Sequence, residues 1–248
     1  MVNTTLGIDI GGSAVKGALV NTDTGELASE RIRKVTREPL KPKEIVGLIA
    51  TIQKELKYTG PIGAGFPGII RHGIVCSSAN LHKNWVGEDL PALIRAKTGQ
   101  QASAINDADA AGLAEMRFGI QEAHNYHVVL FLTIGTGIGS AIFLDGKLLP
   151  NTEFGHIEIR GKDAEYRASA AIKRIEKLSW KAWGERFTEV LKKYEFLCSP
   201  DLIILGGGVS ARFDAFSKYL KVDTKVVPAK LQNLAGIIGA AMAAKESL

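Results

Sequence analysis

Cysteine is scarce in this chain, and its scarcity excludes two classes of protein. Only Cys76 and Cys198 occur among the 248 residues, and they lie far apart in the sequence. A small scaffold cross-linked by disulfides needs several cysteines, and so does a zinc site built from thiolates. The sequence therefore favours a globular protein that is stabilised by its hydrophobic core, in a compartment where thiols stay reduced.

Long apolar runs are also missing. No stretch approaches the roughly 18 consecutive apolar residues that a membrane-spanning helix requires. The opening residues, MVNTTLGIDIGG, contain no basic segment followed by an apolar run and a small-residue cleavage site, so we expect no signal peptide. The expected location is the cytoplasm, with no membrane partner.

A strong excess of either charge is absent as well. The chain has 31 basic and 26 acidic residues, and its net charge of +5 is compatible with an anionic substrate without requiring one. The excess concentrates between Arg160 and Lys193, where ten basic residues stand against five acidic ones. Such a stretch is either a solvated helix face or a binding surface for a polyanion.

What the sequence does contain is an internal repeat. The segment from Leu6 to Val20 reads LGIDIGGSAVKGALV, and the segment from Leu130 to Leu144 reads LFLTIGTGIGSAIFL. The two align without gaps at an offset of 124 residues, which is half the length of the chain. Each has two alternating apolar runs around a glycine-rich turn, the pattern of a β-hairpin, and a third strand-like segment follows. We therefore predict two halves that are related by duplication.

The remaining segments alternate between helical and strand patterns, which favours an α/β architecture. Apolar spacing predicts helices over 43–57, 90–97, 107–118, 180–197 and 234–245, and strands over 61–65, 102–105 and 202–205. We expect two lobes, 1–108 and 109–234, with a C-terminal helix at about 235–248 that packs back on the first lobe.

Three glycine-rich turns carry the first chemical signal. Glycines have no Cβ, so backbone N–H groups in such turns can approach a phosphate closely. The chain has no P-loop motif, and the turn at Gly135 opens an alternating strand, which excludes a dinucleotide-binding fingerprint. Each turn alone could be an ordinary hairpin, but three together favour a phosphate donor. The residues assigned to that donor are Asp9, Gly11, Gly12, Ser13, Lys16, Thr133, Gly135, Thr136, Gly137, Gly207 and Gly208.

Within this set, Asp9 is the candidate for a metal contact. It ends a predicted strand beside the first turn, where its carboxylate could hold Mg²⁺ through water while Lys16 offsets phosphate charge. Mg²⁺ is therefore the expected cofactor.

The sequence Asn106-Asp107-Ala108-Asp109 follows one predicted strand and begins a helix. Asn and Asp are favoured helix caps, so capping explains one of these polar residues. A second carboxylate at this point could accept a proton from a hydroxyl group. Glu153 and His156 form another polar cluster, in a loop, and their side chains suit hydrogen bonds to vicinal sugar hydroxyls.

Seven motifs together resemble the ROK family of sugar kinases and repressors, within the actin–hexokinase superfamily. The resemblance runs from about Leu6 to Ala244, and the motifs in order are DIGGSAVKG, GFPG, ANLHKNW, INDADAAGLAE, LTIGTGIGS, EFGH and LIILGGGVS. Within the family, the chain is most similar to the polyphosphate glucokinase group. That closer match rests on LPNTEFGHIEI, DAEYRASA, LSWKAWGERF and LQNLAGIIGAA.

The resemblance implies a two-lobed actin/hexokinase-like fold, a duplicated ribonuclease H-like α/β architecture with a central cleft. It implies transfer of a phosphoryl group to the 6-hydroxyl of glucose, with Asp107 as the catalytic base, and it makes a homodimer the expected assembly. The sugar-binding residues that it implies are Asn80, Asn106, Asp107, Glu153, His156 and Glu165. The family's repressors carry an N-terminal DNA-binding domain, and here the first glycine-rich turn begins within about ten residues of Met1, so no nucleic-acid partner is expected.

One departure from the family concerns zinc. The resemblance to the family implies a cysteine-rich zinc motif shortly after the Gly-His pair. The stretch 159–171 of this chain, however, has no cysteine. Zinc is therefore not expected, and Glu165 is assigned to the sugar without the support of that motif.

Inorganic polyphosphate is the expected phosphoryl donor, together with ATP. A long polyanion needs a track of cations, and Arg174, Lys177 and Lys181 have the spacing of one helix face. The alternatives are a strictly ATP-dependent hexokinase acting on glucose, mannose or fructose, and a non-catalytic sugar sensor. An actin-like filament protein would have no use for the polar residues at Asp107 and His156.

Overall fold

Two strands with alternating apolar side chains form the first hairpin. In the computed structural model, β1 (Thr4–Ile10) and β2 (Ala14–Asn21) pair antiparallel, with Ile10 opposite Val15 at the turn. The structure describes residues 3–36, 40–78 and 81–246. Successive side chains of a strand point to opposite faces, so β1 presents Ile8 on one face and Gly7 and Asp9 on the other.

The first sheet has the strand order β3-β2-β1-β4-β7. Its other strands are β3 (Ile32–Val35), β4 (Ile62–Phe66) and β7 (Ala102–Asn106). β3 continues the antiparallel hairpin, whereas β4 pairs parallel with β1 and with β7. Parallel strands need crossover connections, which α1 (Pro42–Glu55) and α2 (Leu90–Thr98) supply. The two helices contact each other, α1 contacts β1 and β2, and α2 contacts β7.

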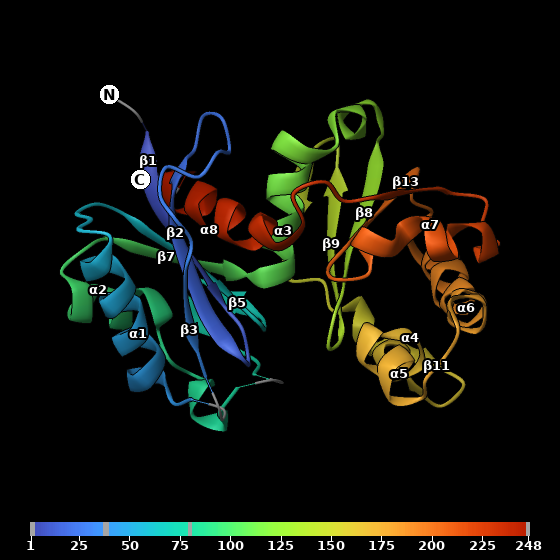
Figure 1. The fold of residues 1–248 in the computed structure, drawn as a ribbon, viewed down its shortest axis with the longest axis horizontal. Coiled ribbons are helices and arrows are strands. Elements are labelled where there is room, and N and C mark those ends of the chain that lie inside the picture. Colours follow the sequence, from blue (N-terminus) through green and yellow to red (C-terminus); the bar gives the residue numbers. More distant parts are fainter. Residues whose placement is uncertain (1–2, 37–39, 79–80, 247–248) are drawn as a thin grey trace. The chain divides into compact units, whose positions relative to one another are not determined.

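The C-terminal helix lies against the opposite face of this sheet, as Figure 1 shows for α8 and β1. Helices α3 and α8 span Asp107–Ala114 and Ala235–Glu246. α8 contacts β1, β4 and α3. A Cβ on Gly7 would lie 2.0 Å from the carbonyl oxygen of Ile237, and one on Gly63 would lie 1.7 Å from that of Ala240. Only glycine leaves room for a helix backbone this close to a sheet.

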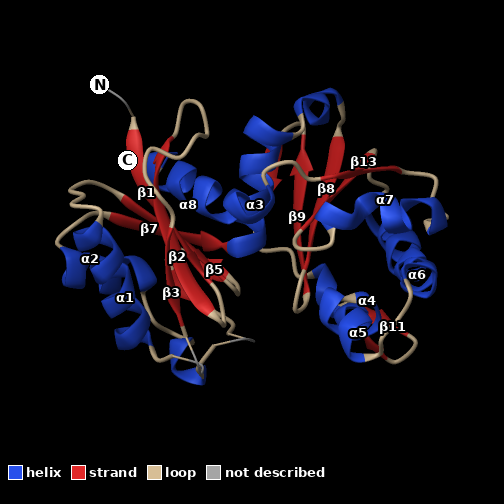
Figure 2. Ribbon diagram, in the orientation of Figure 1, coloured by secondary structure: helices blue, strands red, loops and turns tan. Residues whose placement is uncertain are grey.

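The second sheet repeats the plan of the first, with the order β10-β9-β8-β13-β14. Figure 2 shows its strands β8, β9 and β13 as red arrows. Its strands are β8 (Val128–Ile134), β9 (Ile138–Leu144), β10 (Lys147–Leu149), β13 (Leu202–Gly206) and β14 (Lys225–Pro228). A hairpin with a third antiparallel strand again meets two parallel strands. The turn differs in one respect, because Ile134 lies opposite Ile138, leaving three residues between the closing pair where the first hairpin has four.

Aromatic side chains fill the core between this sheet and its helices. The helices are α4 (Ala164–Ala168), α5 (Ala170–Ile175), α6 (Trp180–Cys198) and α7 (Phe213–Phe216). Trp183 of α6 is fully buried and stacks on Phe187, with ring centres 4.9 Å apart. Its indole N–H donates to the carbonyl oxygen of Ala168 at 3.0 Å. This bond fixes the end of α4 against α6.

Short elements complete the chain. They are β5 (Ile70–Arg71), β6 (Ile74–Val75), β11 (Glu158–Ile159), β12 (Lys162–Asp163), the π-helical turn Glu115–Gly119, and 3₁₀ turns at Lys83–Trp85, Gln121–Asn125, Phe154–His156, Ser210–Arg212, Ser217–Tyr219 and Gln232–Leu234. Two compact units result: Met1–Ala114 with Leu234–Leu248, and Glu115–Asn233. Lobe boundaries at 108 and 234 remain our proposal from the sequence. Over the described residues, no helix combines the length and the apolar character needed to cross a membrane.

The helix predicted over 107–118 ends four residues early, at Ala114. Glu115 follows it with its side chain fully buried. The carboxylate accepts the backbone N–H groups of Lys230 at 3.0 Å and Leu231 at 2.6 Å, and the chain continues as a π-helical turn to Gly119. The contact is long-range in sequence, so local periodicity could not indicate it.

The single helix face expected for Arg174, Lys177 and Lys181 is wrong. α5 ends at Ile175, and Lys177 has a left-handed backbone with a φ of 50°. A new helix then begins at Trp180, capped by Ser179, whose side-chain oxygen accepts the N–H of Ala182. The three cations therefore belong to a helix, a turn and a second helix.

Candidate active site

Asp107 is the first residue of α3 and directly follows β7. The side chain of Asn106, which is 4% exposed, caps the helix: its Oδ1 accepts the N–H groups of Ala108 at 2.9 Å and Asp109 at 3.0 Å. Because Asn106 does the capping, the half-buried Asp107 is not needed for it. A helix N-terminus also favours a negative charge, so this is a suitable place for a carboxylate base.

The turn after β4 holds the Asn106 side chain. Nδ2 of Asn106 donates to the carbonyl oxygen of Gly68 at 3.2 Å, so the GFPG motif positions the cap of α3. A Cβ on Gly68 would lie 2.3 Å from the carbonyl oxygen of Ser77, which explains the glycine. The assignment of Asn106 to the sugar stays a prediction, and the second hydrogen of its Nδ2 is the atom that could serve it. Asn80 lies outside the described residues.

On the predicted donor side, the structure brings Asp9 and Lys16 together. They lie opposite each other in the first hairpin, with Lys16 Nζ 2.7 Å from Asp9 Oδ2, and Gly11, Gly12 and Ser13 form the turn beside them. Their side chains are 20% and 28% exposed, respectively. A Cβ on Gly236 would lie 3.7 Å from Asp9 Oδ1, so the first turn of α8 also faces this carboxylate.

This arrangement is compatible with the Mg²⁺ contact predicted for Asp9. Lys16 binds one oxygen of Asp9, which leaves the carboxylate a single oxygen to offer a cation. Mg²⁺ in kinases takes most of its ligands from water and from substrate phosphates, with one or two carboxylates. Asp9 is therefore suited to contact the ion through water, and not as part of an all-protein cage.

The other two glycine-rich turns lie side by side in the second unit. Thr133 and Gly206 are partners in the pairing of β8 with β13, so the turn 135–137 and the turn after Gly206 leave the same edge of the sheet. Gly207 has a φ of 75°, and a Cβ there would lie 2.5 Å from the carbonyl oxygen of Ile134. The predicted donor residues Thr133, Gly135, Thr136, Gly137, Gly207 and Gly208 thus form one group.

The loop with Glu153 and His156 is fixed by hydrogen bonds. Ser140 Oγ of β9 donates to the carbonyl oxygen of Thr152 at 2.9 Å and accepts the N–H of Phe154 at 3.0 Å. The hydroxyl of Tyr194, on α6, donates to the carbonyl oxygen of Phe154 at 2.9 Å. A loop held from both a strand and a helix can present the side chains of Glu153 and His156 in a defined geometry.

Glu153, His156 and Glu165 interact electrostatically. Burial raises the pKa of Glu153; His156 opposes this rise and Glu165 adds to it. The hydrogen bond to Asp163 raises the pKa of His156, burial opposes this, and the charges of Glu165, Glu153 and Asp163 add to it. Three of the predicted sugar ligands therefore lie near one another. The carboxylates of Glu153 and Glu165 offer hydrogen-bond acceptors to a polyhydroxyl compound, and the ring of His156 donates or accepts according to its protonation.

The same corner has donor atoms close enough together to surround an ion. One atom each of His156, Asp163 and Glu165 lies within 4.8 Å of the others. His156 Nδ1 and Asp163 Oδ2 are 2.9 Å apart, the separation of a hydrogen bond. Hydrogen bonding accounts for the closeness of His156 and Asp163 without a metal ion.

Asp163 is the residue that sequence reasoning missed. Its only sequence signal was its place between His156 and Glu165, two residues before the latter.

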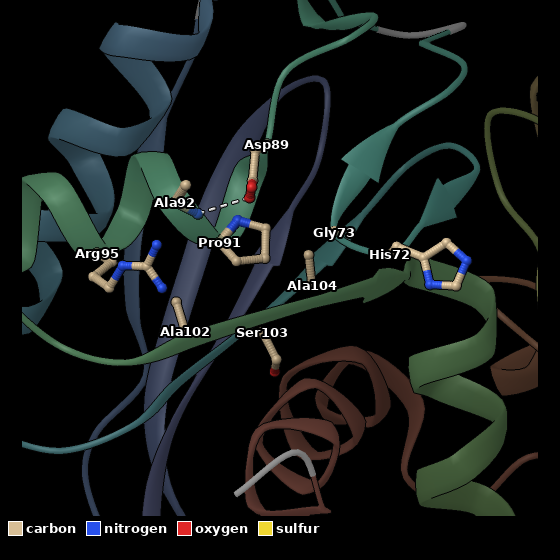
Figure 3. Close-up of a pocket in the computed structure, with 9 residues that line it drawn as sticks. All are labelled: His72, Gly73, Asp89, Pro91, Ala92, Arg95, Ala102, Ser103 and Ala104. Carbon is tan, nitrogen blue, oxygen red and sulfur yellow. Dashed lines mark hydrogen bonds between the residues drawn. The ribbon is translucent and has the colours of Figure 1, made fainter.

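A separate hollow of about 290 Å³, lined by His72, Asp89, Arg95 and Ser103 among others, lies at the edge strand β7 (Figure 3). None of the predicted site residues lines it, and Asp89 there caps α2 by accepting the N–H of Ala92.

Comparison with known proteins now identifies the family. The family model described as "ROK family" matches residues 5–171. The chain belongs to the ROK family. The polyphosphate glucokinase of Mycobacterium tuberculosis (strain CDC 1551 / Oshkosh) is 45% identical over 238 residues, which cover 96% of this ROK protein and 89% of the relative.

Two solved structures carry the comparison further. The inorganic polyphosphate/ATP-glucomannokinase of Arthrobacter sp. strain KM superposes with a TM-score of 0.94 at 44% identity, covering 99% of each chain. A ROK family glucokinase from Streptomyces griseus, solved with glucose and AMPPNP, gives a TM-score of 0.84 at 23% identity, covering 98% and 99%. The α/β class and the actin/hexokinase-like fold predicted from the sequence are confirmed.

Proposed function

We propose that this ROK protein transfers a phosphoryl group from inorganic polyphosphate, and also from ATP, to the 6-hydroxyl of glucose. The observation that carries the proposal is the 44–45% identity, over nearly the whole chain, to two enzymes named for polyphosphate-dependent sugar phosphorylation. The capped Asp107 and the loop with Glu153 and His156 support it from the side of chemistry.

Asp107 is the proposed catalytic base. A hexose hydroxyl is a weak nucleophile, and a positioned carboxylate that takes its proton during attack on phosphorus contributes typically 10²–10⁴-fold. Asn106 holds the start of α3 rigid through two backbone N–H groups, which fixes the position of the neighbouring carboxylate. Glu153, His156 and Glu165 are the proposed hydrogen-bond partners of the remaining hydroxyls, with Asn80 and Asn106 as further contacts.

The donor side has to neutralise charge, because phosphoryl transfer leaves the protein little covalent chemistry to do. Backbone N–H groups of the glycine-rich turns and the ammonium group of Lys16 are the proposed contacts to phosphate. Asp9 is the residue that would contact Mg²⁺ through water. When bound, the ion supplies charge neutralisation at the phosphates.

The choice of donor is tested by a panel of purified protein with long-chain polyphosphate and ATP against glucose, mannose and fructose. We expect turnover of glucose with both donors, and polyphosphate should be the better one. Mannose is the second acceptor to try, since the Arthrobacter relative is named a glucomannokinase. Turnover with ATP alone would reject polyphosphate and leave the ATP-dependent hexokinase; binding of glucose without any turnover would favour a sensor.

The cytoplasm is the proposed location, where ATP and glucose are both available. The two cysteines carry free thiols, which fits a reducing compartment. A homodimer is the proposed assembly. Sedimentation or light scattering of the purified chain tests it directly.

A further inference from the structure

Asp163 occupies a helix-capping position but does not cap. It directly precedes α4, with a ψ of 144°, and its side chain accepts no hydrogen bond from the helix. Aspartate at this position ordinarily accepts an N–H of the first helical turn. Here Oδ2 of Asp163 binds Nδ1 of His156 at 2.9 Å instead. The carboxylate of Asp163 thus bonds an imidazole seven residues away in the sequence and not the first turn of its own helix.

The backbone brings Asp163 back to His156 by a tight hairpin. β11 and β12 pair antiparallel with Glu158 opposite Asp163, and the turn uses the left-handed residues Arg160 and Gly161. The N–H of Ala164 then donates to the carbonyl oxygen of Ile157 at 2.9 Å. These bonds hold the residue after His156 against the residue after Asp163, so the two side chains face each other.

Ion pairs anchor this hairpin to the long helix of the second unit. Arg160, at the hairpin turn, and Arg167, on α4, both bind the carboxylate of Glu189 on α6, at 3.1 Å and 3.0 Å. One anchor lies before Asp163 in the chain and the other after it. The carboxylate of Asp163 is therefore held in place on both sides.

We propose that Asp163 is a positioning residue for sugar binding, which accepts the Nδ1 proton of His156 and thereby directs Nε2 of the ring toward a hexose hydroxyl. This inference rests on the proposed function, in which His156 contacts the sugar. Which ring nitrogen carries the proton is set by the partner of the other one, and a carboxylate on Nδ1 fixes both tautomer and ring orientation.

The surroundings of His156 support orientation as the role of the pair. The charged groups that face the ring are Asp163 from β12, Glu165 from α4 and Glu153 from its own loop, and the adjacent β9 contains no titratable residue. The side chains of His156 and Asp163 are 48% and 38% exposed. Ion pairs at such exposure contribute little to folding stability, so a loss of sugar binding in an Asp163 variant would not be expected to come from unfolding.

A double-mutant cycle tests the proposal. Asp163→Ala should raise the glucose KM about tenfold, the scale of one charge-assisted hydrogen bond, with kcat and the polyphosphate KM unchanged. Asp163→Asn, which keeps an acceptor for Nδ1–H, should recover much of the loss. In the His156→Ala background, Asp163→Ala should have no further effect. The control is Asp145→Ala, which removes the carboxylate from the other His–Asp pair of this unit, with His127, and should change nothing.

Several outcomes would overturn the proposal. Additive effects of His156→Ala and Asp163→Ala would mean that Asp163 acts independently of the ring, and equal rises in the glucose and polyphosphate KM would mean general disruption. Nitrogen NMR of the unliganded protein gives a readout that needs no turnover: wild type should carry the His156 proton on Nδ1, and Asp163→Ala should lose that preference. If the wild type neither binds nor phosphorylates glucose, the proposed activity fails. A wild-type glucose KM in His156→Ala would leave the activity standing and would overturn the sugar contact of His156 together with this inference.

Discussion

At the scale of single residues, Asn106 and Asp107 have different roles: Asn106 caps a helix, and Asp107 is the proposed catalytic base. Asn106 caps α3, so Asp107 is not needed for capping. We expect Asp107→Asn to lower kcat about 10²–10⁴-fold while glucose binding persists, because the amide keeps its hydrogen bonds and loses its basicity. A coupled assay for glucose 6-phosphate and calorimetric titration of glucose measure the two quantities. Near-wild-type turnover in this variant would remove Asp107 from its role, with the exposed Asp145→Asn as the matched control.

The half-buried carboxylate of Glu153 predicts an acid limit for sugar binding. Burial raises its pKa above the ordinary value of 4.5, and Glu165 adds to this rise. The ionised group can accept hydrogen bonds from two hydroxyls, and protonation converts one of its oxygens from an acceptor into a donor. We therefore expect kcat/KM for glucose to fall as the pH drops through this raised pKa. Glu153→Gln should lower kcat/KM and flatten its acid limb; an unchanged limb in the variant would assign the titration to another group.

At the scale of elements, the close approach of β1 and β4 to the backbone of α8 requires glycine at two positions. Cβ atoms on Gly7 and Gly63 would lie 2.0 Å and 1.7 Å from backbone carbonyl oxygens of α8. We expect Gly7→Ala and Gly63→Ala each to lower the free energy of unfolding by about 1–3 kcal/mol or more, because the helix must move away from the sheet. Gly47→Ala in α1 is the control: nothing lies within 4 Å of its Cβ, so the change should be neutral or stabilising. Urea denaturation compares the three, and equal losses would contradict this packing argument.

The anchor formed by Glu189 predicts a pH dependence of stability. The hydrogen bond from Arg167 lowers the pKa of Glu189 below its ordinary 4.5, with Arg160 contributing further. A lowered folded-state pKa stabilises the fold above the unfolded value, and this contribution is lost as the pH falls through the folded value. Glu189→Gln should therefore be less stable than wild type at neutral pH, and the difference should shrink below pH 4.5. Exposed Glu185→Gln, on the same helix, should show no such pH-dependent difference.

The elements that sequence reasoning found are those whose signals are local. The repeat at an offset of 124 residues indicated both hairpins, and apolar spacing located α1, α2 and α6 to within about two residues. The early end of the helix predicted over 107–118 arose from a long-range contact. Glu115 leaves the helical ladder for Lys230 and Leu231, and periodicity holds no trace of partners more than a hundred residues away.

Site residues followed the same division. Asp107, Glu153 and His156 stand in recognisable motifs, so the sequence could nominate them. Asp163 could not be found in this way, because an aspartate before a short helix is an ordinary cap by every local rule. Only the hairpin of β11 and β12 shows that its carboxylate turns to His156.

At the scale of the whole molecule, the two ends of the chain build one unit. α8 follows the entire second unit in sequence and packs on β1, β4 and α3 of the first. A chain truncated after Asn233 should therefore lose the folded first unit while the second keeps its structure. Hydrogen exchange read by mass spectrometry measures both: fast exchange is expected over β1 and β4, with protection retained over β8 and β13. Native protection of β1 in the truncated chain would contradict the dependence on α8.

The one-residue difference between the two hairpin turns bears on how two similar halves of a chain come to differ in function. Asp9 faces Lys16 across the first hairpin, whereas Thr133, at the equivalent position, faces Gly139. Ser140, the counterpart of Lys16, is thereby turned to the opposite side of its sheet, since a shift of one residue exchanges the faces of a strand. There it binds the loop of Glu153 and His156. The different closure of the two turns thus places Lys16 beside Asp9 and its counterpart Ser140 in the support of the predicted sugar-binding loop, although the same number of residues separates the paired positions in both halves.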